Sequence, residues 1–442
     1  MENINHIKVG IDPNGANLPS IKELLGKTDS IQTAERNAAS EGNFYEPLGD
    51  KIGPGMNSRV QRLRKLSFEA EPSISIERAL HQTAFYKEHY GKHSIPVLRA
   101  LTFLDHCEKK TLYFGEDELI VGERGPVPKA VPTFPELTCH SVEDFHVLNS
   151  RDQQRYTTSQ EDINTYAKEV IPYWEGRTQR ERIFNHVPDT WKRAYEAGLF
   201  TEFMEQRAPG HTVLDGKIYK KGMLDFKKEI QDHIDSLDYM MDAEANDKAE
   251  QLKAMAISCD ASIVFAERHA DLAEERAQTE SDPAKKAELL KIAEVCRWVP
   301  ANAPRTFHEA VQMYWFVHLG TITELNGWDA MNPGHFDQHL TPFYEKEIAE
   351  GTLTREEALI ATTRANALLM FQEQNIGAIK PGLLADMLVL DRDYFTVPAD
   401  EIKDIQYLDD PNELVSLLNS SKLNFGAFVN NILSFFIIAG ST

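Results

Sequence analysis

A histidine at the end of a proline–glycine turn is the clearest residue in this sequence that could do chemistry. It is His211, the last residue of the run APGH at 208–211. Because proline fixes one backbone angle and glycine frees the next, such a turn can present an imidazole at a defined angle. Imidazole exchanges a proton near neutral pH, which suits assistance to a leaving hydroxyl group. The competing interpretation is an ordinary histidine in a surface loop.

A carboxylate at the end of a long apolar run is the second candidate. Asp329 follows Trp328 and closes a run that begins at Phe307 and is mostly apolar. A carboxylate in such a setting is expected to be buried, and therefore paired or functional. Trp328 would form the adjacent wall of a site. The alternatives are a turn or helix-capping aspartate and an ordinary core tryptophan.

The sequence offers little support for a metal site. His335 and His339 are four residues apart, with Asp337 between them, and on a helix this spacing could bind a divalent metal. No third ligand is indicated, and no H-x-H pair occurs anywhere in the chain. We therefore predict that the chain binds no metal.

Composition and charge exclude several classes of protein. The chain has 442 residues and a net charge of −22, which argues against a nucleic-acid or anionic-membrane surface. Its four cysteines are widely spaced and form no CxxC pair, which favours free thiols and a reducing cytoplasm. No secretory signal is visible, and the apolar run near the C-terminus is too short to span a bilayer. We expect a cytoplasmic protein.

Helices are expected to carry most of these residues. Helical periodicity is clear over 76–90, and a second helix over 95–110 opens with a proline near its first turn. Residues 111–123 are typical of a turn and a short strand. Residues 1–57 lack periodicity and favour an extended or disordered extension, with at most one short helix around 21–25.

The region 223–296 is strongly helical in pattern. One apolar stripe recurs at steps of three and four residues and contains Leu252, Met255, Cys259, Ile263, Ala266 and Ala270. The run Ser281-Asp282-Pro283 breaks the chain and caps a following helix, which buries Leu289, Ile292 and Cys296. An almost wholly apolar helix over 308–319 should be buried. The pattern predicts cysteines 259 and 296 to be ordinary core sulfurs.

Several long motifs in a fixed order resemble the N-terminal half of the glycyl radical enzymes. They are SISIERA (73–79), IPVLRALTF (95–103), ELIVGERG (118–125), FTEFMEQRAPGHTVLD (200–215) and FHEAVQMYWFVHLGTITELNGWDAM (307–331). The resemblance runs from about 57 to 351 and is closest to the dehydratases of trans-4-hydroxy-L-proline. Arg99 and Glu123 lie in these motifs and are interpreted as structural.

The resemblance implies a fold, a reaction and a set of site residues. The family fold is a ten-stranded β/α barrel wrapped in helices, so a mainly α chain with some β, forming an incomplete half-barrel, is expected. His211 would contact the leaving hydroxyl, and Asp329 and Trp328 would line the substrate pocket. Intact relatives carry a glycyl radical installed under anaerobic conditions by an iron–sulfur enzyme that uses S-adenosylmethionine. A small-molecule substrate, that activating enzyme and a homodimer are the implied partners.

The second half of the family pattern is not in this sequence. Neither the cysteine–glutamate (C-V-E type) motif nor the R-V-S-G-Y-like glycine loop occurs, so the chain is expected to be inactive by itself and to hold no cofactor. Residues 354–405 instead resemble the C-terminal end of an amidohydrolase, with ADMLVLD as the clearest strand. An amidohydrolase activity is disfavoured, because the metal ligands of that family lie upstream in an H-x-H pattern that is missing here.

The expected domains are 1–57 (extension), 58–353 (glycyl radical half), 354–406 (amidohydrolase-like segment) and 407–442 (apolar tail). Two alternatives stay open. One is a sister lyase acting on a small diol, choline or isethionate, and the other is a non-enzymatic chimeric or pseudogene fragment joined near residue 353.

Overall fold

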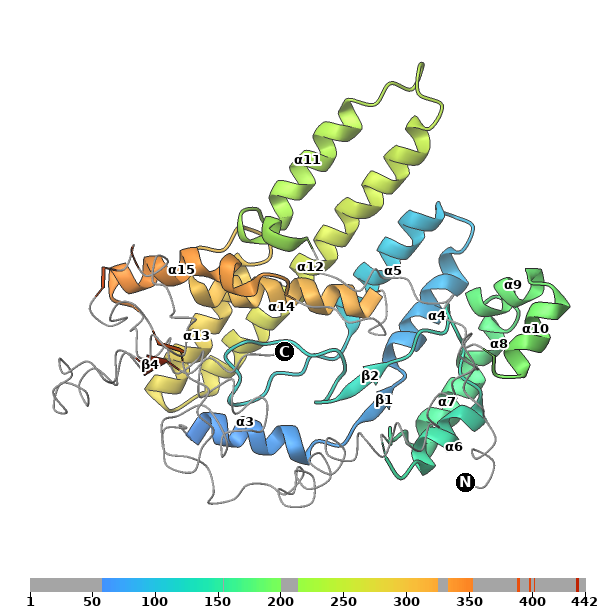
Figure 1. Cartoon of the computed structure of the whole chain (residues 1–442), viewed down its shortest axis with the longest axis horizontal. Coiled ribbons are helices and arrows are strands. Elements are labelled where there is room, and N and C mark those ends of the chain that lie inside the picture. The colour runs from blue at the N-terminus through green and yellow to red at the C-terminus, as the bar shows by residue number, and fades with distance from the viewer. Residues whose placement is uncertain are drawn as a thin grey trace, which may run out of the picture. The chain divides into compact units, whose positions relative to one another are not determined.

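The computed structural model describes residues 58–153, 155–199, 214–324 and 333–352, with 388–389, 397–398, 401 and 435–436 (Figure 1). The chain divides into two compact units, one made of 1–61, 360–389 and 420–442 and the other of 62–359 and 390–419. The expected short helix around 21–25 lies outside the described residues. No helix within the described ranges is both long and apolar enough to cross a membrane.

The described elements are mostly helices. In chain order they are α3 (Ser58–Glu69), β1 (Ser73–Ser75), α4 (Glu77–His89), α5 (Ile95–Lys109), β2 (Ala130–Pro132), α6 (Val142–Ser150), α7 (Gln160–Glu169), α8 (Ile171–Trp174), α9 (Gln179–His186), α10 (Asp189–Glu196), η3 (Asp215–Tyr219), α11 (Met223–Asp235), α12 (Ala245–Thr279), α13 (Pro283–Trp298), α14 (Phe307–Glu324), α15 (Phe336–Glu350), β3 (Leu388–Val389) and β4 (Phe435–Phe436).

The larger unit contains a short parallel strand pair. β1 and β2 pair in parallel, with Ile74 opposite Val131. The other edge of β1 is bridged by Thr157, whose carbonyl oxygen accepts from the Ile74 amide at 2.9 Å. The pair is covered by a core cluster built from α4, α6, α7 and α8, whose largest fully buried side chains include Phe145 and Tyr166.

The smaller unit contains a two-residue strand pair. β3 lies within the run ADMLVLD, where the sequence predicts a strand, and pairs antiparallel with β4. Leu388 lies opposite Phe436, and Val389 lies opposite Phe435. The pair connects the amidohydrolase-like segment with the apolar tail, to which the sequence analysis assigns no role.

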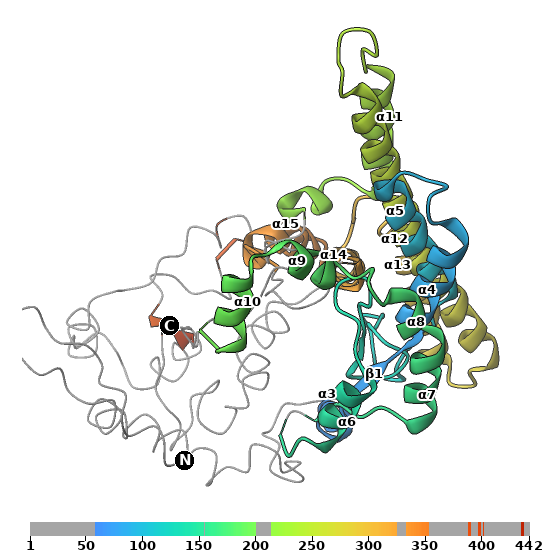
Figure 2. The same ribbon diagram turned by 90° about the vertical axis from the view of Figure 1, so that its right-hand side faces the viewer.

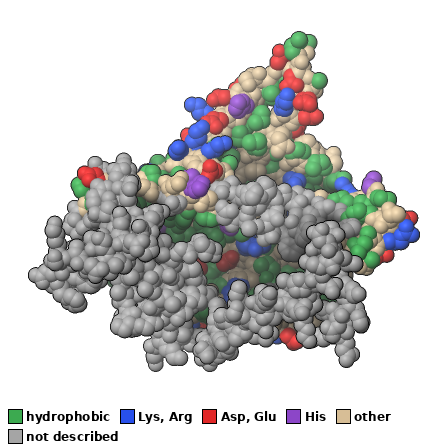
Figure 3. Space-filling view, viewed as in Figure 1, with side chains coloured by type: hydrophobic (Ala, Val, Ile, Leu, Met, Phe, Trp, Pro, Cys, Tyr) green, Lys and Arg blue, Asp and Glu red, His purple; other side chains and the backbone are tan. Residues whose placement is uncertain are grey.

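The 35-residue helix α12 is central to the larger unit. It packs along α5 and α13 and contacts α14, and α11 runs back along it to form a projecting hairpin (Figures 1 and 2). Its buried face is rich in alanine, which allows neighbouring helices to approach closely. The hairpin tip carries exposed Tyr239, Met240 and Met241, within a surface of mixed charge (Figure 3).

The helix boundaries follow the local signals in the sequence. Asp282 caps α13 by accepting from the Ala284 amide at 2.9 Å, with Pro283 in the first turn. Leu289, Ile292 and Cys296 are buried, as predicted. The expected helices over 76–90, 95–110 and 308–319 correspond to α4, α5 and part of α14.

Two expectations from the sequence are wrong. Residues 111–123 contain no strand, because the Val121 backbone is paired by a side chain: its N–H donates to Gln312 Oε1 and its carbonyl accepts from Gln312 Nε2, both at 2.8 Å. Met255 is 47% exposed and not part of a buried stripe, because it lies on the wall of a cavity between α5, α11 and α12.

Candidate functional site

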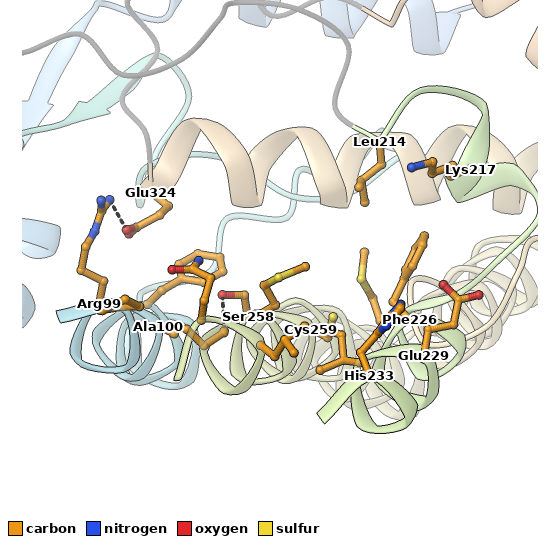
Figure 4. Close-up of a pocket in the computed structure, with 18 of the residues that line it drawn as sticks. Arg99, Ala100, Leu214, Lys217, Phe226, Glu229, His233, Ser258, Cys259 and Glu324 are labelled. Carbon is orange, nitrogen blue, oxygen red and sulfur yellow. Dashed lines mark hydrogen bonds and ion pairs between the residues drawn. The ribbon is translucent and has the colours of Figure 1, made fainter. Parts of the chain in front are cut away.

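The residues that flank both predicted site segments line one cavity. The cavity has a volume of about 790 Å³, and Leu214 and Glu324 are both in its wall (Figure 4). His211, Trp328 and Asp329 themselves lie outside the described residues. The structure therefore brings together the two ends of chain that lead to these residues.

The cavity has an apolar floor and polar ends. Three helices and the η3 turn supply the apolar side chains, which include Phe103, Met223, Phe226, Leu252, Met255 and Cys259. Arg99 and Glu324 form an ion pair at one end, and Lys217 lies near the other end, where Lys221 pairs with Glu229 (Figure 4). Such a surface suits a small molecule with apolar carbon atoms and polar substituents at its ends.

Arg78 anchors the end of α14 beside this cavity. Its guanidinium is 4% exposed, donates to the Thr323 carbonyl at 2.7 Å and to the Thr133 carbonyl at 3.3 Å, and forms two bonds with the Glu136 carboxylate. Glu324 lies 3.8 Å from the same guanidinium. One side chain of α4 thus fixes the last turn of α14, from which the chain continues toward Asp329.

The charges in this network stabilise one another. Burial alone would lower the pKa of Arg78, but Glu136 and Glu324 outweigh that effect and raise the pKa above its ordinary value. Burial raises the pKa of Glu324, and Arg99 and Arg78 oppose the shift. The Phe134 ring, 4.3 Å from the Arg78 guanidinium carbon, adds a cation–π contact. The interpretation of Arg99 as structural remains a prediction, since the same side chain also lines the cavity.

His339 contacts an aspartate from a distant part of the chain. Its Nε2 lies 2.9 Å from Asp215 Oδ1, and its ring stacks on Tyr219. Within the described ranges, no group of three potential ligands could hold a metal ion. No local pattern in the sequence indicates the pairing, because the two partners are 124 positions apart.

The four cysteines are all free, and two of them are deeply buried. Burial raises the pKa of Cys107 and of Cys296 to about 12, and that of Cys259 to about 11. Cys139 is half-buried, with its sulfur 3.7 Å from the Tyr166 hydroxyl. The prediction that Cys259 and Cys296 are core sulfurs is confirmed by their burial.

Alkylation should therefore discriminate between these thiols. Under native conditions near neutral pH, we expect Cys107 and Cys296 to react with iodoacetamide at least about a hundredfold more slowly than in urea, because the thiolate is the reacting form. Cys139 should be labelled first. Peptide mass spectrometry of timed samples measures each rate, and a native Cys107 that reacts as fast as Cys139 would contradict the prediction.

The described fold, which is mainly helical, matches glycyl radical enzymes of known structure. The chain belongs to the pyruvate formate lyase-like family, whose family model matches residues 56–365. A second model, the amidohydrolase family, matches 340–417 and overlaps the first. The resemblance of this region to an amidohydrolase is thereby confirmed, with wider bounds than the sequence suggested.

Within the family, the chain is similar to a trans-4-hydroxy-L-proline dehydratase and to an isethionate sulfite-lyase. The enzyme from Clostridioides difficile is 50% identical over 304 residues, which cover 69% of this chain and 38% of the relative. Isethionate sulfite-lyase from Nitratidesulfovibrio vulgaris is 35% identical over 340 residues, covering 72% and 41%. The chain thus spans about two fifths of the length of these relatives.

Comparison with solved structures also finds similarity to dehydratases of this family. Hydroxyproline dehydratase from Clostridioides difficile, with trans-4-hydroxy-L-proline bound, is 49% identical with a TM-score of 0.67, covering 70% of this chain and 39% of that one. A Roseburia inulinivorans protein described for 1,2-propanediol dehydration is 30% identical with a TM-score of 0.65, covering 69% and 36%. The predicted fold class, mainly α with some β of glycyl radical enzyme type, is confirmed.

Proposed function

We propose that this chain carries the substrate-recognition part of a glycyl radical C–O lyase that acts on trans-4-hydroxy-L-proline. One observation carries the choice of substrate. The chain is 50% identical to a trans-4-hydroxy-L-proline dehydratase but 35% identical to an isethionate sulfite-lyase, over matches of similar length. The cavity supports the proposal, because an apolar floor with polar ends suits a ring that carries a hydroxyl, an amine and a carboxylate.

In this proposal His211 contacts the leaving hydroxyl, and Asp329 and Trp328 line the pocket. Chain connectivity supports their meeting at the cavity. His211 is three residues from Leu214 and Asp329 is five from Glu324, so their Cα atoms lie within about 11 Å and about 18 Å of these wall residues. An imidazole can donate a proton to the departing oxygen, and a carboxylate can hold the polar groups of the ring.

The radical itself would come from polypeptide that the printed sequence does not contain. By resemblance, a thiyl radical on the cysteine of that half would abstract the substrate hydrogen, and the glycine would store the radical. We propose that the 442-residue chain alone performs no turnover, since it has neither the cysteine–glutamate motif nor the glycine loop. The proposal extends to an anaerobic cytoplasmic setting, with a radical activating enzyme as partner and a homodimer as assembly.

A chimeric origin is the second candidate, and the overlap of two unrelated family models around 340–365 favours it. In this view the domains keep the predicted bounds at 57/58, 353/354 and 406/407. A single long DNA read spanning the codons for 344–371 tests it. Reads that continue from residue 353 into the cysteine–glutamate half would identify a dehydratase gene behind a wrongly joined sequence, and reads that confirm the junction would establish a natural fusion.

Substrate recognition can be tested directly on the chain by saturation-transfer NMR. We expect trans-4-hydroxy-L-proline to bind, and L-proline to bind about tenfold more weakly because it lacks the hydroxyl that His211 would contact. His211→Ala should reduce binding of hydroxyproline and leave that of proline unchanged. Stronger binding of 1,2-propanediol, choline or isethionate would instead assign the chain to a sister lyase, and no binding of any of them would exclude autonomous recognition.

A further inference from the structure

The turn at the cavity wall has an unfavourable backbone conformation. Leu214 and Asp215 have positive φ angles of 57° and 45°, in consecutive positions without glycine. Residues with side chains rarely adopt this region, and each instance costs free energy that neighbouring contacts must offset. The turn then closes into η3 through a hydrogen bond from the Lys217 amide to the Leu214 carbonyl at 3.0 Å.

His339 supplies contacts that hold this turn. Its Nε2 donates to Asp215 Oδ1 at 2.9 Å, and its ring lies 5.1 Å from the Tyr219 ring at an interplanar angle of 23°. The turn approaches the ring so closely that a Cβ atom on Gly216 would lie 3.1 Å from His339 Cε1. The His339 side chain is 17% exposed, so its ring is shielded from water, while the Asp215 side chain is 69% exposed.

The contact joins two stretches that are distant in sequence. α15, which carries His339, begins shortly after the stretch that holds Asp329, and the turn begins three residues after His211. The same turn places Leu214 in the cavity wall. His339 therefore holds the turn through which the chain continues from His211 to the cavity wall.

We propose that His339 is a positioning residue, which holds the turn at 214–216 against the cavity through Asp215, Gly216 and Tyr219. The inference rests on the proposed function for its effect on the substrate, but the contact itself does not. The hydrogen bond from His339 is the main cause that lowers the pKa of Asp215, which keeps this carboxylate ready to accept. His339 does not need to touch the substrate in this role.

Hydrogen exchange followed by mass spectrometry tests the contact in the full chain. In His339→Ala, the amides of the peptide covering 214–219 should exchange about tenfold faster, because a hydrogen bond to a charged group is lost. His339→Gln, whose side-chain amide can still donate to Asp215, should stay within about threefold of the unaltered chain. Gln338→Ala, an exposed position of α15 next to His339, is the matched control and should leave the peptide unchanged.

Unaltered exchange within α12 shows that the variants remain folded. Equal exchange of 214–219 in the alanine variant and the unaltered chain would overturn the proposal, as would a glutamine variant as fast as alanine. Hydroxyproline binding is the second measurement, and it should weaken about tenfold in His339→Ala and recover in His339→Gln. If the unaltered chain binds no hydroxyproline, the proposed function fails, while the exchange result still decides whether the contact exists. If His339→Ala exchanges faster at 214–219 but binds hydroxyproline as tightly as the unaltered chain, the positioning role is overturned.

Discussion

Replacing Arg78 by alanine is expected to lower the free energy of unfolding by about 3–5 kcal/mol, because it leaves the Glu136 carboxylate without its counter-charge and two backbone carbonyls without their donor. The guanidinium is 4% exposed and binds Glu136 together with the carbonyls of Thr133 and Thr323. Its loss removes the charge that holds Glu136 and Glu324 together at the end of α14. Equilibrium urea unfolding, monitored by tryptophan fluorescence, measures the change.

Two further variants separate geometry from charge. Arg78→Lys should recover only a small part of the lost stability. An ammonium group lacks the planar, forked arrangement of donors with which the guanidinium reaches Glu136 and two carbonyls. Arg62→Ala removes an exposed ion pair with Asp117 and should scarcely change the unfolding midpoint. An Arg78→Ala variant as stable as Arg62→Ala would show that the network contributes nothing to folding.

The second large effect is expected at Gly222, where α11 meets the loop before α14. The Met223 and Leu224 amides donate to the carbonyls of Pro300 and Ala301, so backbone rather than a side chain satisfies these N–H groups. A Cβ on residue 222 would lie 2.2 Å from the Ala301 carbonyl oxygen and 2.3 Å from Asn302 Cα. Gly222→Ala should therefore destabilise the protein by about 3 kcal/mol, since neither backbone can move without breaking these bonds.

The same substitution in α14 provides the contrast. Gly320 lies inside the helix, and an added Cβ would be in ordinary contact with Phe103 at 3.4 Å. Gly320→Ala should be neutral or stabilising by up to about 1 kcal/mol, because alanine favours helix. Thermal unfolding of both variants measures the difference. If Gly222→Ala and Gly320→Ala destabilise the protein equally, the close backbone approach at Gly222 is not the cause of the destabilisation.

Local signals in the sequence were sufficient to predict α4, α5, α12, α13 and part of α14. Proline in the first turn of α5, and Asp282 before α13, act within a few residues, so their effect can be predicted without the rest of the fold. The stripe on α12 was correct where the neighbouring helix is close, as at Ala266 and Ala270. It was wrong at Met255, which is exposed on the wall of a cavity lined by α5, α11 and α12.

Contacts between distant residues could not be predicted in this way. The sequence shows a β-like run around Val121, but not that Gln312 would take both of its backbone hydrogen bonds. The residues next to Arg78 in the sequence do not distinguish it from a surface arginine on an amphipathic helix. The motifs did locate the stretches that meet at the cavity, while the roles of His211 and Asp329 remain predictions.

The close backbone contact at the start of α11 also has a mechanical consequence. The helix is 13 residues long, or about 20 Å, and is packed closely at Gly222. The hairpin tip that follows it carries Met240, which is 91% exposed. Because α11 packs along α12, a tilt at its base would be carried through the whole hairpin to the tip. Changes in the loop at 300–302 would redirect that distant surface without altering any residue on it.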